Sequence, residues 1–345
     1  GFAWYQGGRN LFDPEPIAVG QSKSIQLRKP RATDSGRICV AVSAGSNSEV
    51  EVYMGDRQLG RLPIRLLEYD KGNERRAVYP FVSTDELKPL EIKVVSGGPV
   101  RLDYVSITWD GAVPAPIFKS NDFAVPELVG VVGNQNRHAD AQADMVIIVP
   151  SSGKLTAQAM RLKEFHEKKD GLRVNIVPAD ELYNEFSSGT PDANAYRRYL
   201  KMLYDRAASA DDAPRYLLLF GDGVWDNRML TNETKGLNPD DYLLCYESEN
   251  SFNQVECYVD DNFFGLLDDG EGGDLQARDL PDVAVGRFPV STADEAKIMV
   301  DKTISYATNA NAGAWQNTLV FMGDDGNNNL HMDDANTAAD EMASQ

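Results

Sequence analysis

A run of five apolar residues followed by Gly-Asp-Gly constrains this chain more than any other feature. Residues 215–223 read RYLLLFGDG, and the apolar run is too short for a globular helix and shows no apolar–polar alternation. Such a run is typical of a strand covered on both faces, as in a parallel sheet with helices on either side. The glycines end the strand and place Asp222 at its carboxyl end, the edge where ligands and catalytic groups gather in open α/β sheets.

The same design recurs along the second part of the chain, where apolar strands alternate with amphipathic helices. Ser291 is a suitable N-cap for one of these helices. The alternation predicts a parallel, doubly wound sheet within residues 143–345. The expected strands are 145–149, 172–177, 216–220, 283–288 and 318–322, and the expected helices are 155–166, 194–208, 292–306 and one from about 333.

The first part of the chain has a different pattern. Short alternating segments separated by turn residues fill residues 20–110 and predict an antiparallel β-sandwich module over 1–110. Its aromatic residues, such as Tyr104 and Trp109, favour core packing over a sugar-binding platform. A proline-containing stretch without periodicity begins the segment 111–142, which we interpret as a linker or as a strap along the next domain.

Composition limits the classes of function. The chain has 53 acidic and 34 basic residues, a net charge of -19, which argues against nucleic acid as a partner and is compatible with a secreted or surface protein. Three cysteines imply no disulfide framework, although Cys245 and Cys257 are able to pair. The chain starts without Met and ends inside a helical pattern, so we expect a piece of a larger protein.

The acidic residues crowd into one segment, where nine carboxylates lie between Glu256 and Asp282. Calcium takes six to eight oxygen ligands in flexible loops, and this segment has the carboxylates and glycines to supply them. We therefore predict a Ca²⁺ site, with a solvated acidic face as the alternative. The predicted metal ligands are Asp222, Asp260, Asp261, Asp279 and Asp282.

Other motifs are weaker. PSSGKLT (150–156) resembles a phosphate loop but lacks its first glycine and its Ser or Thr after the lysine, so a nucleotide site is not expected. Asp324 and Asp325 follow an apolar run and either cap the next helix or orient a catalytic histidine supplied from later in the chain. A third, weaker interpretation makes Asp222 or Asp324 a phosphoacceptor.

Four segments together resemble the gingipain family of cysteine peptidases. They are YLLLFGDG, YVDDNFFGLLD, DVAVGRFPV with its following helix and tyrosine, and LVFMGDDG, in this order. The resemblance extends over nearly the whole chain and implies a caspase-like α/β sheet with a Cys–His dyad. By alignment on the strand-end motif, the acid that orients the histidine is Asp325, and an acidic substrate-pocket position is Asp333.

Among gingipain-like proteins, the chain is most similar to the sortases of type IX secretion. This implies an outer-membrane, cell-surface enzyme of Gram-negative Bacteroidetes that removes C-terminal signal domains from secreted cargo and joins the cargo to anionic lipopolysaccharide. An outer-membrane barrel such as PorV is the implied partner. None of Cys39, Cys245 and Cys257 matches the family's nucleophile, so we expect the chain alone to be inactive. The alternative is a non-catalytic, calcium-stabilised surface or adhesion module.

Overall fold

The computed structural model describes most of the chain and divides it into two units. The described residues are 1–27, 35–82, 87–111, 123–128, 131, 133–273 and 278–343. The first unit is Gly1–Ala296 and the second is Lys297–Gln345. The boundary lies inside the peptidase domain predicted for 143–345, and the two units are described separately below.

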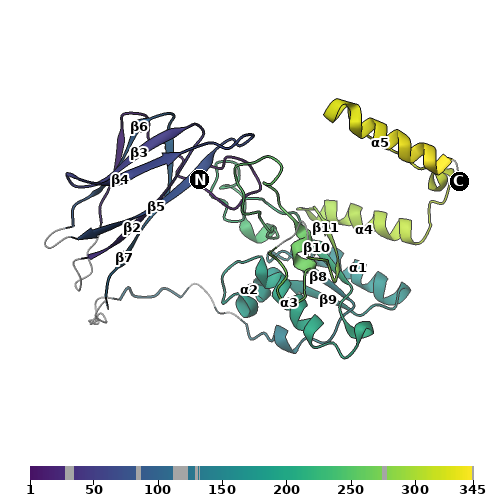
Figure 1. Ribbon diagram of the computed structural model, residues 1–345. Helices are drawn as coiled ribbons and strands as arrows, with labels where there is room; N and C mark the ends of the chain where they lie inside the picture. The colour runs from purple at the N-terminus through teal and green to yellow at the C-terminus, as the bar shows by residue number, and fades with distance from the viewer. Residues whose placement is uncertain are drawn as a thin grey trace. The chain divides into compact units, whose positions relative to one another are not determined.

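The N-terminal part of the first unit is an antiparallel β module of two sheets (Figure 1). One sheet has the strand order β1-β6-β3-β4 and the other has the order β5-β2-β7. Alternate side chains of the two sheets, such as Val40, Val52 and Ile92, meet in one buried core. The strands are β1 (Ser22–Ile25), β2 (Ser35–Ala44), β3 (Ser48–Met54), β4 (Arg57–Ile64), β5 (Asn73–Val82), β6 (Leu90–Ser96) and β7 (Val100–Trp109).

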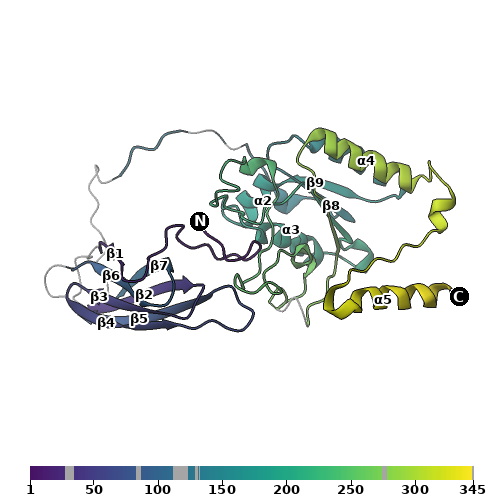
Figure 2. The same ribbon diagram turned by 90° about the horizontal axis from the view of Figure 1, so that it is seen from above.

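The second part of the first unit is a four-stranded parallel sheet with helices on both faces. The strand order is β11-β10-β8-β9, and the predicted α/β fold is confirmed. Helices α2 and α3 lie side by side (Figures 1 and 2) and bury Val146, Ile148 and Leu219 from one face of the sheet. The elements are β8 (Met145–Val149), α1 (Thr156–Lys169), β9 (Val174–Pro178), α2 (Ala179–Phe186), α3 (Asn194–Asp205), β10 (Tyr216–Phe220) and β11 (Ala284–Phe288), with single 3₁₀ turns at Arg137–Ala139, Ala210–Asp212, Pro239–Asp241 and Asp261–Gly265.

Helix α4 (Ala293–Ala307) starts one residue later than the predicted N-cap requires. Thr292 rather than Ser291 caps it, because Thr292 Oγ1 accepts a hydrogen bond from Glu295 N at 3.2 Å while Glu295 Oε2 accepts one from Thr292 N at 3.1 Å. This reciprocal pair satisfies backbone donors at the helix start.

The second unit differs most from the sequence prediction. It contains the rest of α4, a 3₁₀ turn at Ala314–Asn317 and α5 (Gly326–Ala343). Residues 318–322 are not a strand. Leu319, Val320 and Met322 are exposed there, and an apolar run forms a strand only where a neighbouring strand accepts its backbone hydrogen bonds. Among the described residues, no helix has the length and apolarity needed to cross a membrane.

Candidate functional site

The carboxyl ends of the parallel strands form an edge, here called the rim, at which the sequence predicts a functional site. The long connection between β10 and β11, residues 221–283, crosses this rim and is here called the returning loop. Asp222 N donates a hydrogen bond to Val290 O, and Leu243 N donates one to Asp222 O, both at 2.9 Å. The end of β10 is thereby joined to the segment after β11 and to the returning part of its own loop.

The Gly-Asp-Gly motif serves close packing at the rim. A Cβ atom on Gly221 would lie 2.8 Å from Pro150 Cγ. A Cβ atom on Gly223 would lie 2.5 Å from Cys245 Sγ and 3.1 Å from Arg287 Nη1. Both positions therefore need glycine because other chain segments approach the backbone too closely for a side chain.

Arg287, within the DVAVGRFPV segment, ties three parts of the rim together. Its Nε and Nη2 donate to the two carboxylate oxygens of Asp261, each at 2.7 Å. The same guanidinium donates to Gly221 O at 3.2 Å and to Leu244 O at 3.3 Å. A partly buried, bidentate ion pair of this kind fixes geometry as well as charge. Hence Asp261 has a protein cation as its partner.

The predicted metal ligands do not gather around one point. No group of three or more His, Cys, Asp or Glu side chains suited to a metal ion occurs among the described residues. Most of the carboxylates instead accept backbone hydrogen bonds, an arrangement that sequence crowding alone does not reveal. Asp222 accepts from Gly223 N, Asp260 from Asn262 N, Asp279 from Gly272 N, and Asp282 from Leu267 N and from the hydroxyl of Tyr204.

The three cysteines are all free thiols, so Cys245 and Cys257 do not form a disulfide. Cys245 is buried at the rim, and burial raises the pKa of its thiol to about 11. Burial also raises the pKa of Cys257. Since the thiolate is the nucleophilic form, these environments suppress the reactivity that a catalytic cysteine needs.

Two neighbouring acids at the rim have opposite pKa shifts, and the sequence prediction missed both. Burial, reinforced by the charge of Asp226, raises the pKa of Glu247 to about 7. Asp226 is only 2% exposed; burial opposes its ionisation, but hydrogen bonds to Oδ2 from Thr234 Oγ1 at 2.6 Å and from Thr231 N at 2.7 Å outweigh this and lower its pKa. Divergent pKa values in adjacent carboxyls are typical of functional sites.

Two adjoining cavities lie at the rim, and together they are called the rim groove. The larger has a volume of about 480 Å³ and is lined by residues that follow β8 and β10, including Ser151 and Val224. The smaller, of about 330 Å³, contains Asp226 and Glu247 in its lining. The two cavities share Thr190, Pro191, Asn227, Arg228 and Leu244.

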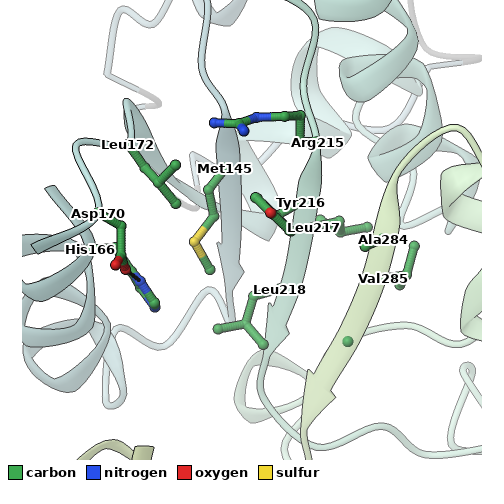
Figure 3. Close-up of a pocket in the computed structure, with 11 residues that line it drawn as sticks. Met145, His166, Asp170, Leu172, Arg215, Tyr216, Leu217, Leu218, Ala284 and Val285 are labelled. Atoms are coloured by element: carbon green, nitrogen blue, oxygen red, sulfur yellow. Dashed lines mark hydrogen bonds and ion pairs between the residues drawn. The ribbon is translucent and has the colours of Figure 1, made fainter. Parts of the chain in front are cut away.

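Another cavity, of about 600 Å³, lies at the opposite end of the strands (Figure 3). Met145 and Leu218 form its apolar wall, and the C-terminal end of α1 and its cap contribute the hydrogen bond between His166 Nδ1 and Asp170 Oδ2 at 2.7 Å. Because catalytic groups of α/β sheets gather at the carboxyl ends of the strands, this amino-end cavity is a less suitable active site than the rim.

The β module contacts the returning loop of the rim. Arg9 N donates to Ser248 O at 3.1 Å, and Lys71 N donates to Phe252 O at 3.0 Å. Asn253 Nδ2 also donates to Asp70 Oδ1 at 3.0 Å. The returning loop is therefore held from both sides, by the parallel sheet and by the β module.

The predicted catalytic acid lies in the second unit. Asp325 and Asp333 are exposed, and Asp333 Oδ1 accepts a hydrogen bond from Asn329 Nδ2 at 2.8 Å. The neighbouring Asp324, rather than Asp325, contacts a histidine, because Asp324 Oδ1 pairs with Nδ1 of His331. This hydrogen bond lowers the pKa of Asp324. The roles given to Asp325 and Asp333 remain predictions.

Known protein structures include one with a similar fold. The chain is similar to dimeric latent PorU from Porphyromonas gingivalis, with 24% identity and a TM-score of 0.72, over 94% of this chain and 39% of that one. A CBM6 module of the laminarinase LamC from Zobellia galactanivorans matches 27% of this chain and 75% of its own length at 17% identity, and its TM-score of 0.22 is too low to indicate a shared fold. No curated protein matches the chain.

At this identity the similarity to PorU shows the fold alone, and the chain spans 39% of the length of that protein. The model of peptidase family C25 matches residues 138–345, more than half of the sequence. The chain therefore belongs to peptidase family C25, the gingipain family of cysteine peptidases.

Proposed function

We propose that this chain is part of a PorU-like sortase, a cysteine endopeptidase and transpeptidase of type IX secretion. The observation that carries the proposal is the C25 match over 138–345 together with similarity to PorU along 94% of the chain. The substrates would be secreted cargo proteins with C-terminal signal domains. The acceptor would be anionic lipopolysaccharide at the outer membrane of a Gram-negative bacterium, with an outer-membrane barrel such as PorV as partner.

The proposed reaction is acyl transfer through a thioester. A cysteine thiolate attacks the carbonyl carbon of the peptide bond that joins the cargo to its signal domain. A histidine donates a proton to the departing amine of the signal domain. An amine of the acceptor then attacks the thioester and releases the thiol, whereas attack by water gives hydrolysis. Transpeptidation and hydrolysis thus differ only in the second nucleophile.

The cysteines of this chain do not suit the role of nucleophile. Cys245 is buried with a pKa of about 11, and the pKa of Cys257 is also raised by burial. Cys39 lies on β2 of the β module. We therefore propose that the nucleophile and its histidine belong to a part of the parent protein outside the present sequence.

The test is cargo processing by the full-length parent. Incubation with a cargo that carries its signal domain should give cleavage that thiol alkylation abolishes. A parent in which Cys39, Cys245 and Cys257 are all replaced by alanine should remain folded and process cargo. Cleavage that survives alkylation would contradict cysteine catalysis, and a folded parent that never cleaves cargo would favour the non-catalytic surface module.

A further inference from the structure

Asp226 is a buried anion with hydrogen-bond donors on only one of its two carboxylate oxygens. The residue is 2% exposed, and its pKa is lowered, so it is ionised at neutral pH. Its Oδ2 accepts hydrogen bonds from Thr231 N and Thr234 Oγ1. Its Oδ1 is also buried, but it has no hydrogen-bond partner among the residues that the structure describes. A buried charge is ordinarily paired with an opposite charge or bound to a metal ion.

A second carboxylate lies beside Asp226 in the smaller cavity of the rim groove. Asp226 and Glu247 both line this cavity, which has a volume of about 330 Å³. Glu247 Oε1 accepts a hydrogen bond from Asn227 N at 3.3 Å, so its carboxylate contacts the residue that follows Asp226. Burial and the charge of Asp226 raise the pKa of Glu247 to about 7. The two carboxylates therefore compete for compensation within one partly enclosed space.

Two arginines of the cavity wall, Arg9 and Arg228, do not neutralise this pair. Both are exposed, and Arg9 forms an ion pair with Glu249. The charges of Arg9 and Arg228 act to lower the pKa of Glu247, but burial and the charge of Asp226 outweigh them, since that pKa is raised. The cavity therefore keeps an excess of negative charge at Asp226 and Glu247.

The segments that carry the two carboxylates are already tied together. Asn227 Nδ2 donates to Cys245 O at 2.7 Å, and Cys245 N donates to Asn227 Oδ1 at 2.8 Å. On the other side of Asp226, the hydroxyls of Thr231 and Thr234 form a 2.9 Å hydrogen bond with each other. Hydrogen bonds of this kind orient the ligands of metal sites before the ion binds.

We propose that Asp226 and Glu247 bind one Ca²⁺ ion in the smaller cavity of the rim groove. Carboxylate oxygens favour a hard cation, and Ca²⁺ tolerates irregular loop geometry and completes a shell of about six to eight oxygens with carbonyls and waters. Its two positive charges compensate both carboxylates. With only two carboxylate ligands, the dissociation constant should be on the order of 10⁻⁴ to 10⁻³ M, as in extracellular calcium modules.

This site differs from the calcium site that the sequence predicts. None of the five acids predicted as metal ligands lines the smaller cavity. The ion at Asp226 and Glu247 joins the first part of the returning loop to its later part, and all the residues of the cavity wall belong to the first unit. The proposal does not rest on the proposed sortase function.

Terbium luminescence tests the site, because Tb³⁺ occupies Ca²⁺ sites and emits when a nearby tryptophan is excited. Trp225 precedes Asp226 and lines the same cavity. Addition of Tb³⁺ to the 345-residue chain should give emission that excess Ca²⁺ removes. Trp225→Phe should lose most of this emission and still bind Ca²⁺ in a calorimetric titration. Glu247→Gln should weaken the binding of both ions by at least about tenfold, since even the loss of an outer-shell partner costs that much.

Two further variants are matched controls. Asp192 lines the same cavity, but its Oδ1 already accepts a hydrogen bond from Asn194 N at 2.9 Å. Asp192→Asn should therefore weaken binding much less than Glu247→Gln does. Asp260→Asn alters the separate acidic segment and should leave the tryptophan-sensitised emission unchanged.

Asp226→Asn should act as Glu247→Gln does, and circular dichroism checks that each variant is folded. Absence of Tb³⁺ emission, emission that Ca²⁺ does not remove, or full emission from Trp225→Phe would overturn the proposal. Equal Ca²⁺ binding by the wild type and the folded Glu247→Gln variant would overturn it as well. Because no cleavage is measured, these outcomes leave the proposed sortase function to its own test.

Discussion

Arg287 holds both carboxylate oxygens of Asp261 at 2.7 Å across 26 residues of sequence. The arginine side chain is only 12% exposed. This pair gives the acidic segment a counter-charge from strand β11 at Asp261, one of the predicted metal ligands. It also joins the loop that carries Asp261 to the end of β10, since the same guanidinium binds Gly221 O.

We expect Asp261→Asn to destabilise the protein by about 1–3 kcal/mol, because it leaves a largely buried guanidinium without its carboxylate. Urea unfolding measures the change. Asp269→Asn is the matched control: Asp269 is 96% exposed and pairs with Lys201 at the surface, so its loss should cost less than about 1 kcal/mol. Equal costs for the two variants would contradict a structural role for the Arg287–Asp261 pair.

The packing of Gly223 against Cys245 predicts a second effect on stability. Gly223→Ala should cost about 1–3 kcal/mol, because its Cβ would lie 2.5 Å from Cys245 Sγ. Adding Cys245→Ala removes that sulfur and should recover part of the loss, which a double-mutant cycle quantifies. Gly286→Ala is the control, since a Cβ there meets nothing within 4 Å. Additive effects of the two substitutions would argue against the contact.

Apolar runs in the sequence correctly predicted most strands of the parallel sheet. Strands β8, β10 and β11, at Met145–Val149, Tyr216–Phe220 and Ala284–Phe288, lie within one residue of the ranges predicted from their apolar runs. The run at 318–322 has the same composition but no strand partner, so composition alone was misleading. Helix α2 was missed because its eight residues are too short to show a clear helical period.

The candidate site was harder to predict because its contacts join distant parts of the chain. The acidic crowding around Asp261 was visible in sequence, but its partner Arg287 belongs to another strand. The sequence did not identify Glu247 as a candidate site residue, because its raised pKa comes from burial in the folded protein. The Gly-Asp-Gly motif correctly marked the rim, although its glycines are explained by packing rather than catalysis.

The raised pKa of Glu247 predicts a specific pH dependence. Its pKa is about 7 in the folded protein against an ordinary value of 4.5, so the folded state holds this proton more tightly than the unfolded state does. The resulting stabilisation is present below pH 4.5 and is lost as the pH rises to 7. Relative to Glu247→Gln, the wild type should therefore be more stable at pH 5 than at pH 8.

Thermal melting of both proteins at the two pH values measures this difference. Glu233→Gln, at an exposed glutamate of the same loop, controls for the loss of one negative charge. A stability difference between wild type and Glu247→Gln that is the same at pH 5 and pH 8 would show that Glu247 titrates as an ordinary surface acid.

The calcium prediction calls for a direct test. Nine carboxylates lie between Glu256 and Asp282, and a divalent cation would relieve their mutual repulsion. If calcium binds, it should raise the melting temperature and chelator should lower it, and the change should shrink in Asp260→Asn. Identical melting curves with and without chelator, at matched ionic strength, would contradict the calcium prediction and leave the solvated acidic face.

The last prediction concerns Asp325, the acid that the family resemblance assigns to orienting the catalytic histidine. In the full-length parent, Asp325→Asn should preserve the fold and slow thioester formation by roughly 10- to 10⁴-fold, as for other orienting carboxylates. Asp324→Asn is the matched control, because Asp324 contacts His331 within the second unit, and it should slow the reaction much less. Single-turnover cleavage measures both rates. If the two variants and the wild type cleave equally fast, Asp325 is a solvated acid of the loop before α5 and takes no part in the chemistry.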